Sequence, residues 1–313
     1  MEDDLGVAPL ARRSVPLPAE FRREAGGDVA LPQLVLSQGS VVHFSGDAIV
    51  NAANTGCLGG GGVDGAVNSA GGRDLRLARE ALPELDARGK RCDTGDAKIT
   101  VGGRLSAKWC IHAVGPNYHM FQGRGKSLET GDELLYSAYV ESMRRAQEVN
   151  AGTLAFCLLS AGIFRGPRPL VDLLVIGLRA IEACVYPGLR EVHVVAFTSE
   201  EVSALREAAS RLWPAGTIEP QSPVSMSTSW STPSPPSSPA RAPAPSRSSA
   251  ASPSPPSSPA RALAPSSPAA ASVGASVAPA SPAAASPAAT AAAAAVFGPQ
   301  PGTPSPVAPP NSP

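Results

Sequence analysis

The sequence predicts an α/β protein, a three-layer α/β/α sandwich followed by a disordered tail. Between residues 28 and 215, short apolar runs typical of strands alternate with segments whose apolar residues recur at helical spacing. From residue 216 to residue 313 the composition shifts to Pro, Ser and Ala. Because roughly 180 residues suffice for one domain with a full core, we expect a flexible leader over 1–27, a globular domain over 28–215 and a disordered tail over 216–313.

In the first half of the domain we expect strands over 34–36 and 47–50, helices over 63–70 and 74–88, and strands over 96–101 and 108–114. Pro83 disturbs the second helix, because proline lacks the backbone N–H that an interior helical position donates. Gly102 and Gly103 form a turn between the last two strands, which are therefore neighbours in the sheet.

In the second half we expect a helix over 132–149, a strand over 154–159, a helix over 169–185, a strand over 191–197 and a final helix from Ser199. Apolar residues recur at helical spacing in the first of these helices. The uninterrupted apolar run 154–159 is typical of a strand buried on both faces in a central sheet. Ser199 is the expected N-cap of the last helix, because two glutamates follow it in the first turn.

The loop after the second strand carries the clearest functional signal. It reads Asn-Ala-Ala-Asn over 51–54, and four consecutive glycines over 59–62 are followed by Val63 and Asp64. A glycine tract is costly in backbone entropy. A strand, a glycine loop and a helix in this order form the geometry that aims backbone N–H groups at phosphate oxygens. The order favours a phosphate-binding loop over a surface linker.

These residues resemble the macrodomain family of ADP-ribose-binding modules, and most closely its MacroD-type ADP-ribosyl hydrolases. The resemblance continues in order through 94–100, 110–116 and 159–165, and it covers residues from about 34 to 213. It implies a mixed central sheet within the three-layer sandwich. In such sheets, ligands bind beyond the carboxyl ends of the strands, which is where the glycine loop begins.

The resemblance implies a site with backbone donors for a diphosphate and polar side chains for the distal ribose. The substrate-binding residues that it implies are Ser40, Val41, Ala53, Asn54, Gly59, Gly60, Gly61, Gly62, Val63, Asp64, Ser160, Ala161, Gly162, Ile163, Phe164, Arg165 and Phe197. The backbone over 60–63 forms one wall around the diphosphate and the backbone over 160–164 forms the other. Gly162 is expected to let the second loop turn tightly.

Asn54 and Asp64 are the catalytic residues that the resemblance implies. Asn54 hydrogen-bonds a hydroxyl of the distal ribose, and Asp64 lies near its anomeric carbon, where a carboxylate can orient or deprotonate a water molecule. Phe164 stacks near the distal ribose and helps to position that water. N-capping of the adjacent helix is the alternative for Asp64. Asn51 is expected to tie the loop together through bonds to its backbone.

The implied adenine site departs from the family pattern at Ser40. The family usually has an aspartate at this position, which accepts a hydrogen bond from the adenine amino group. A hydroxyl makes a neutral bond instead, and charge-assisted bonds are roughly twice as strong. The backbone N–H of Val41 is unaffected. Phe197 matches the aromatic residue on which the family packs adenine, and a place in the core is the alternative.

Two further departures lie close to the implied site. Asn68 stands where MacroD-type members commonly have histidine, and an amide does not titrate near neutral pH. Arg165 replaces a small residue, and its side chain either reaches the phosphates or points into solvent. His112 lies in an apolar strand, where we expect a core histidine rather than a catalytic one.

The composition argues against several classes of protein. The net charge is zero, which disfavours nucleic-acid binding through a basic surface. Five scattered cysteines lack the spacing of a metal site, and we expect neither a metal nor a cofactor. Their pattern indicates reduced thiols, so we expect a cytoplasmic or nuclear protein. We expect no secretory signal, because the acidic start has no apolar core. No apolar run approaches the roughly 20 residues that cross a bilayer, so no membrane association is expected.

The predicted tail contains an internal repeat. Residues 233–242 recur identically at 253–262, with no apolar face on which repeats could stack. We therefore expect a disordered segment with polyproline II character. Each copy contains Ser-Pro-Ala-Arg, which looks like a site for proline-directed kinases, with compositional drift as the alternative origin.

The expected function is that of a monomer that binds ADP-ribose or ADP-ribosylated proteins. It would hydrolyse mono-ADP-ribose from acidic side chains, deacetylate O-acetyl-ADP-ribose, or both. A reader module that binds without cleavage is one alternative, which Ser40, Asn68 and Arg165 favour. A phosphatase acting on ADP-ribose 1″-phosphate and a scaffold working through the tail are the others.

Overall fold

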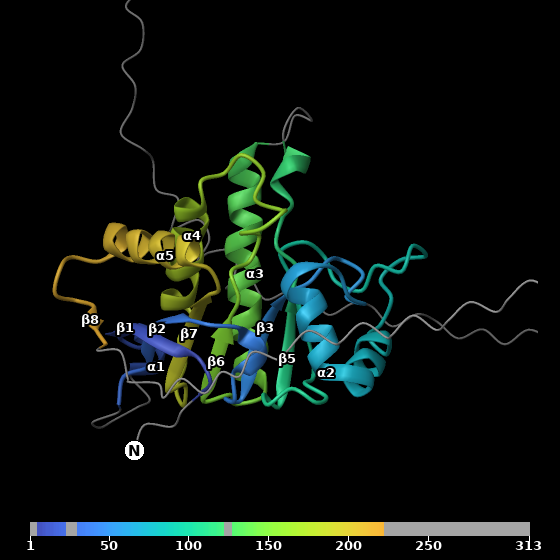
Figure 1. Ribbon diagram of the computed structural model, residues 1–313, viewed down its shortest axis with the longest axis horizontal. Helices are drawn as coiled ribbons and strands as arrows, with labels where there is room; N and C mark the ends of the chain where they lie inside the picture. The colour runs from blue at the N-terminus through green and yellow to red at the C-terminus, as the bar shows by residue number, and fades with distance from the viewer. Residues whose placement is uncertain (1–4, 23–29, 122–126, 222–313) are drawn as a thin grey trace, which may run out of the picture. The chain divides into compact units, whose positions relative to one another are not determined.

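A mixed eight-stranded sheet forms the centre of the computed structural model, which describes residues 5–22, 30–121 and 127–221 (Figure 1). In chain order the strands are β1 (Ala8–Ser14), β2 (Gln33–Gln38), β3 (Ala48–Ala52), β4 (Ala97–Val101), β5 (Trp109–Ala113), β6 (Thr153–Phe156), β7 (Glu191–Ala196) and β8 (Glu219–Pro220). Across the sheet the order is β4-β5-β3-β6-β7-β2-β1-β8. The strands from β5 to β2 in this order are parallel, whereas β4, β1 and β8 pair antiparallel. The mixed sheet is thereby confirmed.

Helices flank the sheet in two groups. The described helices are α1 (Ala19–Arg22), α2 (Gly62–Glu80), α3 (Leu128–Glu148), α4 (Leu170–Ala183) and α5 (Ser199–Leu212), with 3-10 helices η1 (Val41–His43) and η2 (Tyr118–Phe121). α4 packs on both α3 and α5, whereas α2 packs on β3, β4 and η1 (Figure 1). This arrangement matches the predicted three-layer sandwich. No helix in the described ranges is long and apolar enough to cross a bilayer.

The strands predicted between residues 34 and 197 are all present, and the differences concern the ends of elements. β6 ends at Phe156 rather than at residue 159, and α2 ends at Glu80 rather than at residue 88. The N-cap of α5 is Thr198, not Ser199. The Thr198 hydroxyl accepts from Glu201 N (3.1 Å), and Glu201 Oε2 accepts from Thr198 N (2.9 Å). This reciprocal pair satisfies two donors at the helix start.

The N-terminal segment differs from the expected flexible leader, because residues 8–14 form β1 and pair with β2. Two adjacent arginines make this segment look unlike a strand. In the structure, Arg12 Nη1 lies 2.6 Å from Glu191 Oε1, and Arg13 Nη2 lies 2.8 Å from Glu182 Oε1. Both charges are compensated by residues far along the chain, which local pattern does not reveal.

The segment predicted to be disordered from residue 216 begins with residues that pair in the sheet. β8 pairs with Ala11 and Arg12 of β1, and Gln221 N donates to Leu10 O at 3.1 Å. The expected boundary therefore lies several residues too early. The rest of the predicted tail, 222–313, with both copies of the repeat, lies outside the described residues.

Asp47 and Thr153 align the two strands that carry the candidate loops. Asp47 Oδ2 accepts hydrogen bonds from the backbone N–H groups of Gly152 (2.8 Å) and Thr153 (2.9 Å) and from the Thr153 hydroxyl (3.0 Å). These bonds join the amino ends of β3 and β6, whose register pairs Ala48 with Leu154. Because the strands are parallel, both loops leave side by side at the opposite edge of the sheet.

α2 breaks sharply at Gly72, whose φ of 67° and ψ of −150° lie outside the helical region. This conformation is essentially restricted to glycine, and a side chain here would also collide with the guanidinium group of Arg104. In a straight helix Asp64 and Arg79 would lie about 22 Å apart along the axis. In α2 their side chains are in contact, so the break turns the second half of the helix back towards its start.

We expect Gly72→Ala to lower the free energy of unfolding by about 1–3 kcal/mol, because alanine is strained in this conformation. Urea denaturation measures the change. Ser69→Ala, an exposed change in the same helix, is the matched control and should stay within about 0.5 kcal/mol. Equal stabilities of wild type and Gly72→Ala would contradict the assigned role of the break.

Candidate functional site

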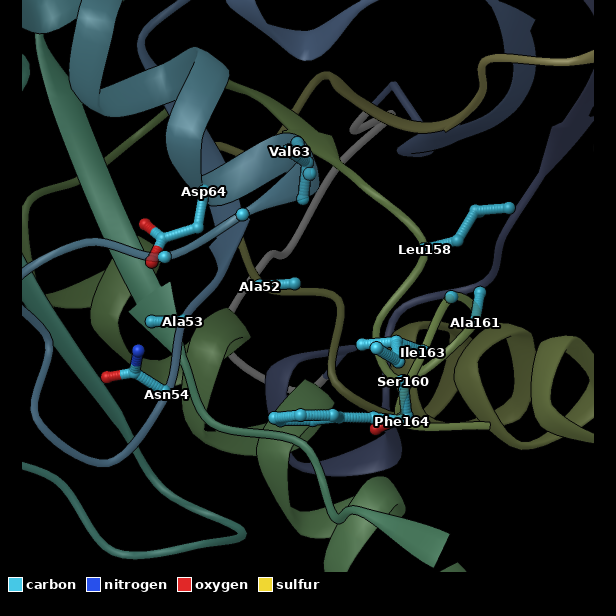
Figure 2. Close-up of a pocket in the computed structure, with 14 residues that line it drawn as sticks. Ala52, Ala53, Asn54, Val63, Asp64, Leu158, Ser160, Ala161, Ile163 and Phe164 are labelled. Atoms are coloured by element: carbon cyan, nitrogen blue, oxygen red, sulfur yellow. The ribbon is translucent and has the colours of Figure 1, made fainter. Parts of the chain in front are cut away.

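A cavity of about 470 Å³ lies between the loops that leave β3 and β6. It is lined by Ala52, Ala53, Asn54, Gly60, Gly61, Gly62, Val63, Asp64, Leu158, Ser160, Ala161, Gly162, Ile163 and Phe164. Figure 2 shows Asn54 and Asp64 on one side of it, with Ile163 and Phe164 on the other. All lining residues except Ala52 and Leu158 were expected. Ala52 directly precedes the expected Ala53, and Leu158 lies two residues before the expected Ser160, so their position in the chain was the available signal.

The start of α2 forms one wall of the cavity with bare backbone. Its N-cap is Gly61, and within the described part of the chain no side chain makes a capping hydrogen bond to it. The first N–H groups of a helix have no partner within it, so those at the start of α2 are available as donors to an anion. Apart from its own neighbours in the chain, a Cβ on Gly61 or Gly62 would meet no atom of the described residues within 4 Å. This geometry suits close approach of a phosphate to the backbone, as the glycine tract predicts.

Asn54 both lines the cavity and holds the glycine loop together. Its Oδ1 accepts from Gly56 N (3.0 Å), and its Nδ2 donates to Gly59 O (2.9 Å). We expected Asn51 to tie the loop to its own backbone, but Asn54 does so instead. Because an amide nitrogen carries two hydrogens, Asn54 keeps one donor for a ligand in the cavity.

Asp64 is held in place by two buried side chains. Its Oδ1 accepts a hydrogen bond from Asn51 Nδ2 (2.8 Å) and lies 2.8 Å from Arg79 Nη1. Asp64 is 3% exposed and Arg79 is 0% exposed, so each charge is compensated only by such neighbours. Since the N-cap of α2 is Gly61, the alternative role of Asp64 as a helix cap is wrong.

The second oxygen of Asp64 faces the glycine loop. Oδ2 is buried and has no hydrogen-bond partner among the described residues. A Cβ on Gly60 would lie only 3.1 Å from it, so a side chain at that position would crowd this oxygen. An unsatisfied buried acceptor costs about 1–3 kcal/mol. A donor bound in the cavity would offset that cost.

Arg79 was not anticipated from the sequence, although a signal was present. Its Nε donates to the carbonyl of Cys57, so one side chain connects the end of α2, the glycine loop and Asp64. The buried residues of α2 after Asp64 are Val67, Gly71, Leu75 and Arg79. This regular helical spacing places Arg79 on the inward face, where a buried arginine requires a carboxylate partner.

His112 is a buried neutral histidine, as predicted, and it completes the support of Asp64. Burial, with the nearby charge of Arg79, lowers its pKa to about 3. The Thr100 hydroxyl donates to Val101 O (3.1 Å), so it accepts from His112 Nε2 (2.9 Å). His112 Nδ1 then accepts from Asn51 Nδ2 at 3.3 Å. A chain of bonds thus runs from β4 through His112 and Asn51 to Asp64.

The loop after β6 forms the opposite wall. Ser160 has a φ of 55°, whereas Gly162 is not left-handed, so the tight turn expected at Gly162 is made at Ser160. The Ser160 hydroxyl donates to Pro116 O at 2.8 Å. The carbonyl of Phe164 accepts from Tyr118 N at 2.8 Å. The loop is therefore anchored at both ends by residues that follow β5.

Ser40, Val41 and Phe197 lie outside the cavity lining. They follow β2 and β7, which are parallel neighbours next to β6, so they reach the same edge of the sheet as the cavity. The Ser40 hydroxyl accepts from Val42 N at 3.4 Å and caps η1. Val41 is buried, whereas Phe197 is 71% exposed. The alternative of a core position for Phe197 is therefore wrong.

Gly59 and Arg165 flank the cavity without lining it. The carbonyl of Gly59 is the acceptor for Asn54, and its φ of 126° favours glycine. Arg165 is half-buried, and its backbone N–H donates to Gly162 O at 3.0 Å. Within the described ranges, no group of three or more His, Cys, Asp or Glu side chains is placed to hold a metal ion.

Known proteins resemble this chain in sequence and in structure. A family model described as Macro domain matches residues 50–171. A macro domain-containing protein of Cupriavidus necator is 41% identical over 178 residues, which are 56% of this chain and 97% of that protein. An O-acetyl-ADP-ribose deacetylase of Escherichia fergusonii is 40% identical over 131 residues, 42% of this chain and 69% of that protein. The Oceanobacillus iheyensis macrodomain with ADP is similar in structure, with a TM-score of 0.51 and 27% identity, covering 59% of this chain and 94% of that chain.

We expect Arg79→Met to lower the free energy of unfolding by about 3–5 kcal/mol, because it leaves the buried carboxylate of Asp64 unpaired. The double variant Arg79→Met, Asp64→Asn should cost less than the sum of the two single changes. Urea denaturation of the four proteins gives the coupling energy. Additive single effects would show that the pair does not interact.

Stability should also depend on pH through His112. The pKa of His112 falls from its ordinary 6.5 to about 3 in the folded protein, so unfolding takes up a proton between these values. The stability linked to His112 is present above pH 6.5 and is lost as the pH falls towards 3. The slope of the unfolding free energy against pH reports how many protons are taken up on unfolding. In His112→Gln this number should fall by up to one between pH 3 and pH 6.5. Identical slopes for the two proteins would contradict the neutral buried imidazole.

Proposed function

This chain belongs to the macrodomain family, and on that premise we propose that its cavity binds ADP-ribose and that it hydrolyses mono-ADP-ribose from acidic side chains of modified proteins. The observation that carries the proposal is the pairing of a bare helix start with Asp64 in one cavity. The first suits a diphosphate. The second places an oriented carboxylate beside the sugar that would carry the modification.

The order of strands supports an elongated ligand across the sheet edge. The distal ribose would lie after β3, near Asn54 and Asp64. The diphosphate would lie between the β3 and β6 loops. The adenine would extend over the ends of β7 and β2, where Phe197 and Ser40 follow the strands. In this arrangement the cavity would hold the distal ribose and the diphosphate but not the adenine. Phe197 and Ser40 would contact the adenine, so they need not line the cavity.

In the proposed reaction, a water molecule attacks the anomeric carbon of the distal ribose. The bond from that carbon to the carboxylate of the protein breaks, and ADP-ribose and a free acidic side chain are released. Asp64 Oδ2 orients the water, because Oδ1 is already engaged by Asn51 and Arg79. Phe164 on the opposite wall limits where the water can lie. No step requires a metal.

Deacetylation of O-acetyl-ADP-ribose is a second activity that we propose for the same cavity. Its support is the 40% identity to a relative named for that activity. There the oriented water attacks the ester carbonyl and releases acetate. A reader that binds without cleavage is the competing function. It is favoured by Asn54, whose amide is partly used in holding its own loop.

We expect Asp64→Ala to lower kcat/KM for release of ADP-ribose from a mono-ADP-ribosylated acidic peptide by about 10²–10⁴-fold. Calorimetry should show wild-type affinity for free ADP-ribose on the order of micromolar, and this affinity should change little in the variant. Asp86→Ala, in an exposed turn, is the matched control. Because Asp64→Ala leaves Arg79 unpaired, the charge-free double variant Asp64→Asn, Arg79→Met is measured beside it.

The outcomes separate the candidate functions. Full turnover by both Asp64 variants would refute the mechanism. Binding of ADP-ribose by wild type without any release from the peptide would favour the reader. Release of phosphate from ADP-ribose 1″-phosphate, with none of the other activities, would favour the phosphatase.

A further inference from the structure

A second cavity, of about 490 Å³, lies at the break of α2 and is rich in arginine. It is lined by Asn68, Ser69, Gly72, Arg73, Asp74, Arg76 and Arg104. Three guanidinium groups and one carboxylate leave it with net positive charge. We call this cavity the arginine cavity. The proposed reaction does not use it.

The three arginines of this cavity have no ion-pair partner in the part of the chain that the structure describes. Arg79, one turn beyond Arg76 on the same helix, is by contrast fully buried and paired with Asp64. Like charges that converge on one cavity repel one another. A bound anion would remove this repulsion, and the guanidinium fork is suited to carboxylates.

The fold builds the arginine cavity from two segments. Arg73 and Arg76 are three residues apart in the second half of α2, so they project from neighbouring positions on that helix. Arg104 comes from the turn between β4 and β5, and its backbone N–H donates to Gly71 O at 3.0 Å. Its guanidinium group lies over the bare backbone of Gly72. The break that positions Arg79 therefore also brings Arg104 next to the other two arginines.

The arginine cavity lies close to the distal-ribose end of the first cavity. Asn68 lines the arginine cavity, and its side chain reaches the glycine loop. A Cβ added to Gly59 would lie 3.6 Å from Asn68 Nδ2. The carbonyl of Gly59 accepts the hydrogen bond from Asn54 at 2.9 Å. The Asn68 side chain therefore lies between the arginine cavity and the glycine loop that lines the first cavity. On the proposed function, a polypeptide attached to the distal ribose lies beside Asp64, four residues before Asn68 in α2.

The geometry points to a binding site for the protein part of the substrate: the arginine cavity binds carboxylate side chains that flank the ADP-ribosylated residue. This inference rests on the proposed function, because that function places the attached polypeptide beside Asp64. Its consequence is specificity. The enzyme prefers modified residues within acidic segments, and free ADP-ribose does not use the arginine cavity.

The test compares two mono-ADP-ribosylated peptides with one modified glutamate each, flanked by glutamates in one and by glutamines in the other. The full chain should show about tenfold higher kcat/KM for the acidic peptide, and added salt should reduce the difference. The triple variant Arg73→Gln, Arg76→Gln, Arg104→Gln should lose the preference while keeping its affinity for free ADP-ribose. The control triple Arg88→Gln, Arg179→Gln, Arg206→Gln removes three exposed arginines elsewhere that have no ion-pair partner among the described residues, and it should keep the preference.

Equal kcat/KM of wild type for the two peptides would overturn the inference. So would equal loss of preference in both triple variants, because the effect would then depend on net charge alone. If neither peptide is cleaved, the proposed hydrolysis fails, and the flanking preference is measured from the Kd of the two peptides. A tenfold lower Kd for the acidic peptide, dependent on the three arginines, supports the inference in that case, and equal Kd values overturn it.

Discussion

The buried ion pair between Asp64 and Arg79 is the interaction on which the site depends. A carboxylate with 3% exposure is tolerated only when charge and hydrogen bonds compensate it. Arg79 supplies the charge and Asn51 supplies a hydrogen bond, both to Oδ1. Oδ2 is left pointing towards the glycine loop. The pair requires the break at Gly72, so a backbone feature in the same helix decides how the Asp64 carboxylate is held.

The nineteen residues of α2 therefore contribute to the site in several ways. Its start offers backbone donors, its first turn carries Asp64, and its second half returns Arg79 to that carboxylate. The same second half turns Arg73 and Arg76 outward beside Arg104. On our account, one face of this helix acts on the sugar and the other recognises the protein to which the sugar is attached.

Much of this architecture could be predicted from the sequence, because it depends on local patterns. Apolar runs marked the central strands, and the glycine tract marked the loop at the start of α2. What could not be predicted depends on partners far apart in the chain. β1 was missed because Arg12 and Arg13 are compensated by Glu191 and Glu182. The role of Asn51 was misjudged for a similar reason, since its partner His112 on β5 is not visible from its neighbours in the sequence.

The most direct test of this account is a crystal structure of the full chain with ADP-ribose. We expect the diphosphate between the glycine loop and the 160–164 loop, accepting hydrogen bonds from backbone N–H groups at the start of α2. The distal ribose should lie next to Asp64 Oδ2, with Oδ1 still paired to Arg79. ADP-ribose bound away from this cavity, or Asp64 turned away from the ribose, would contradict the account.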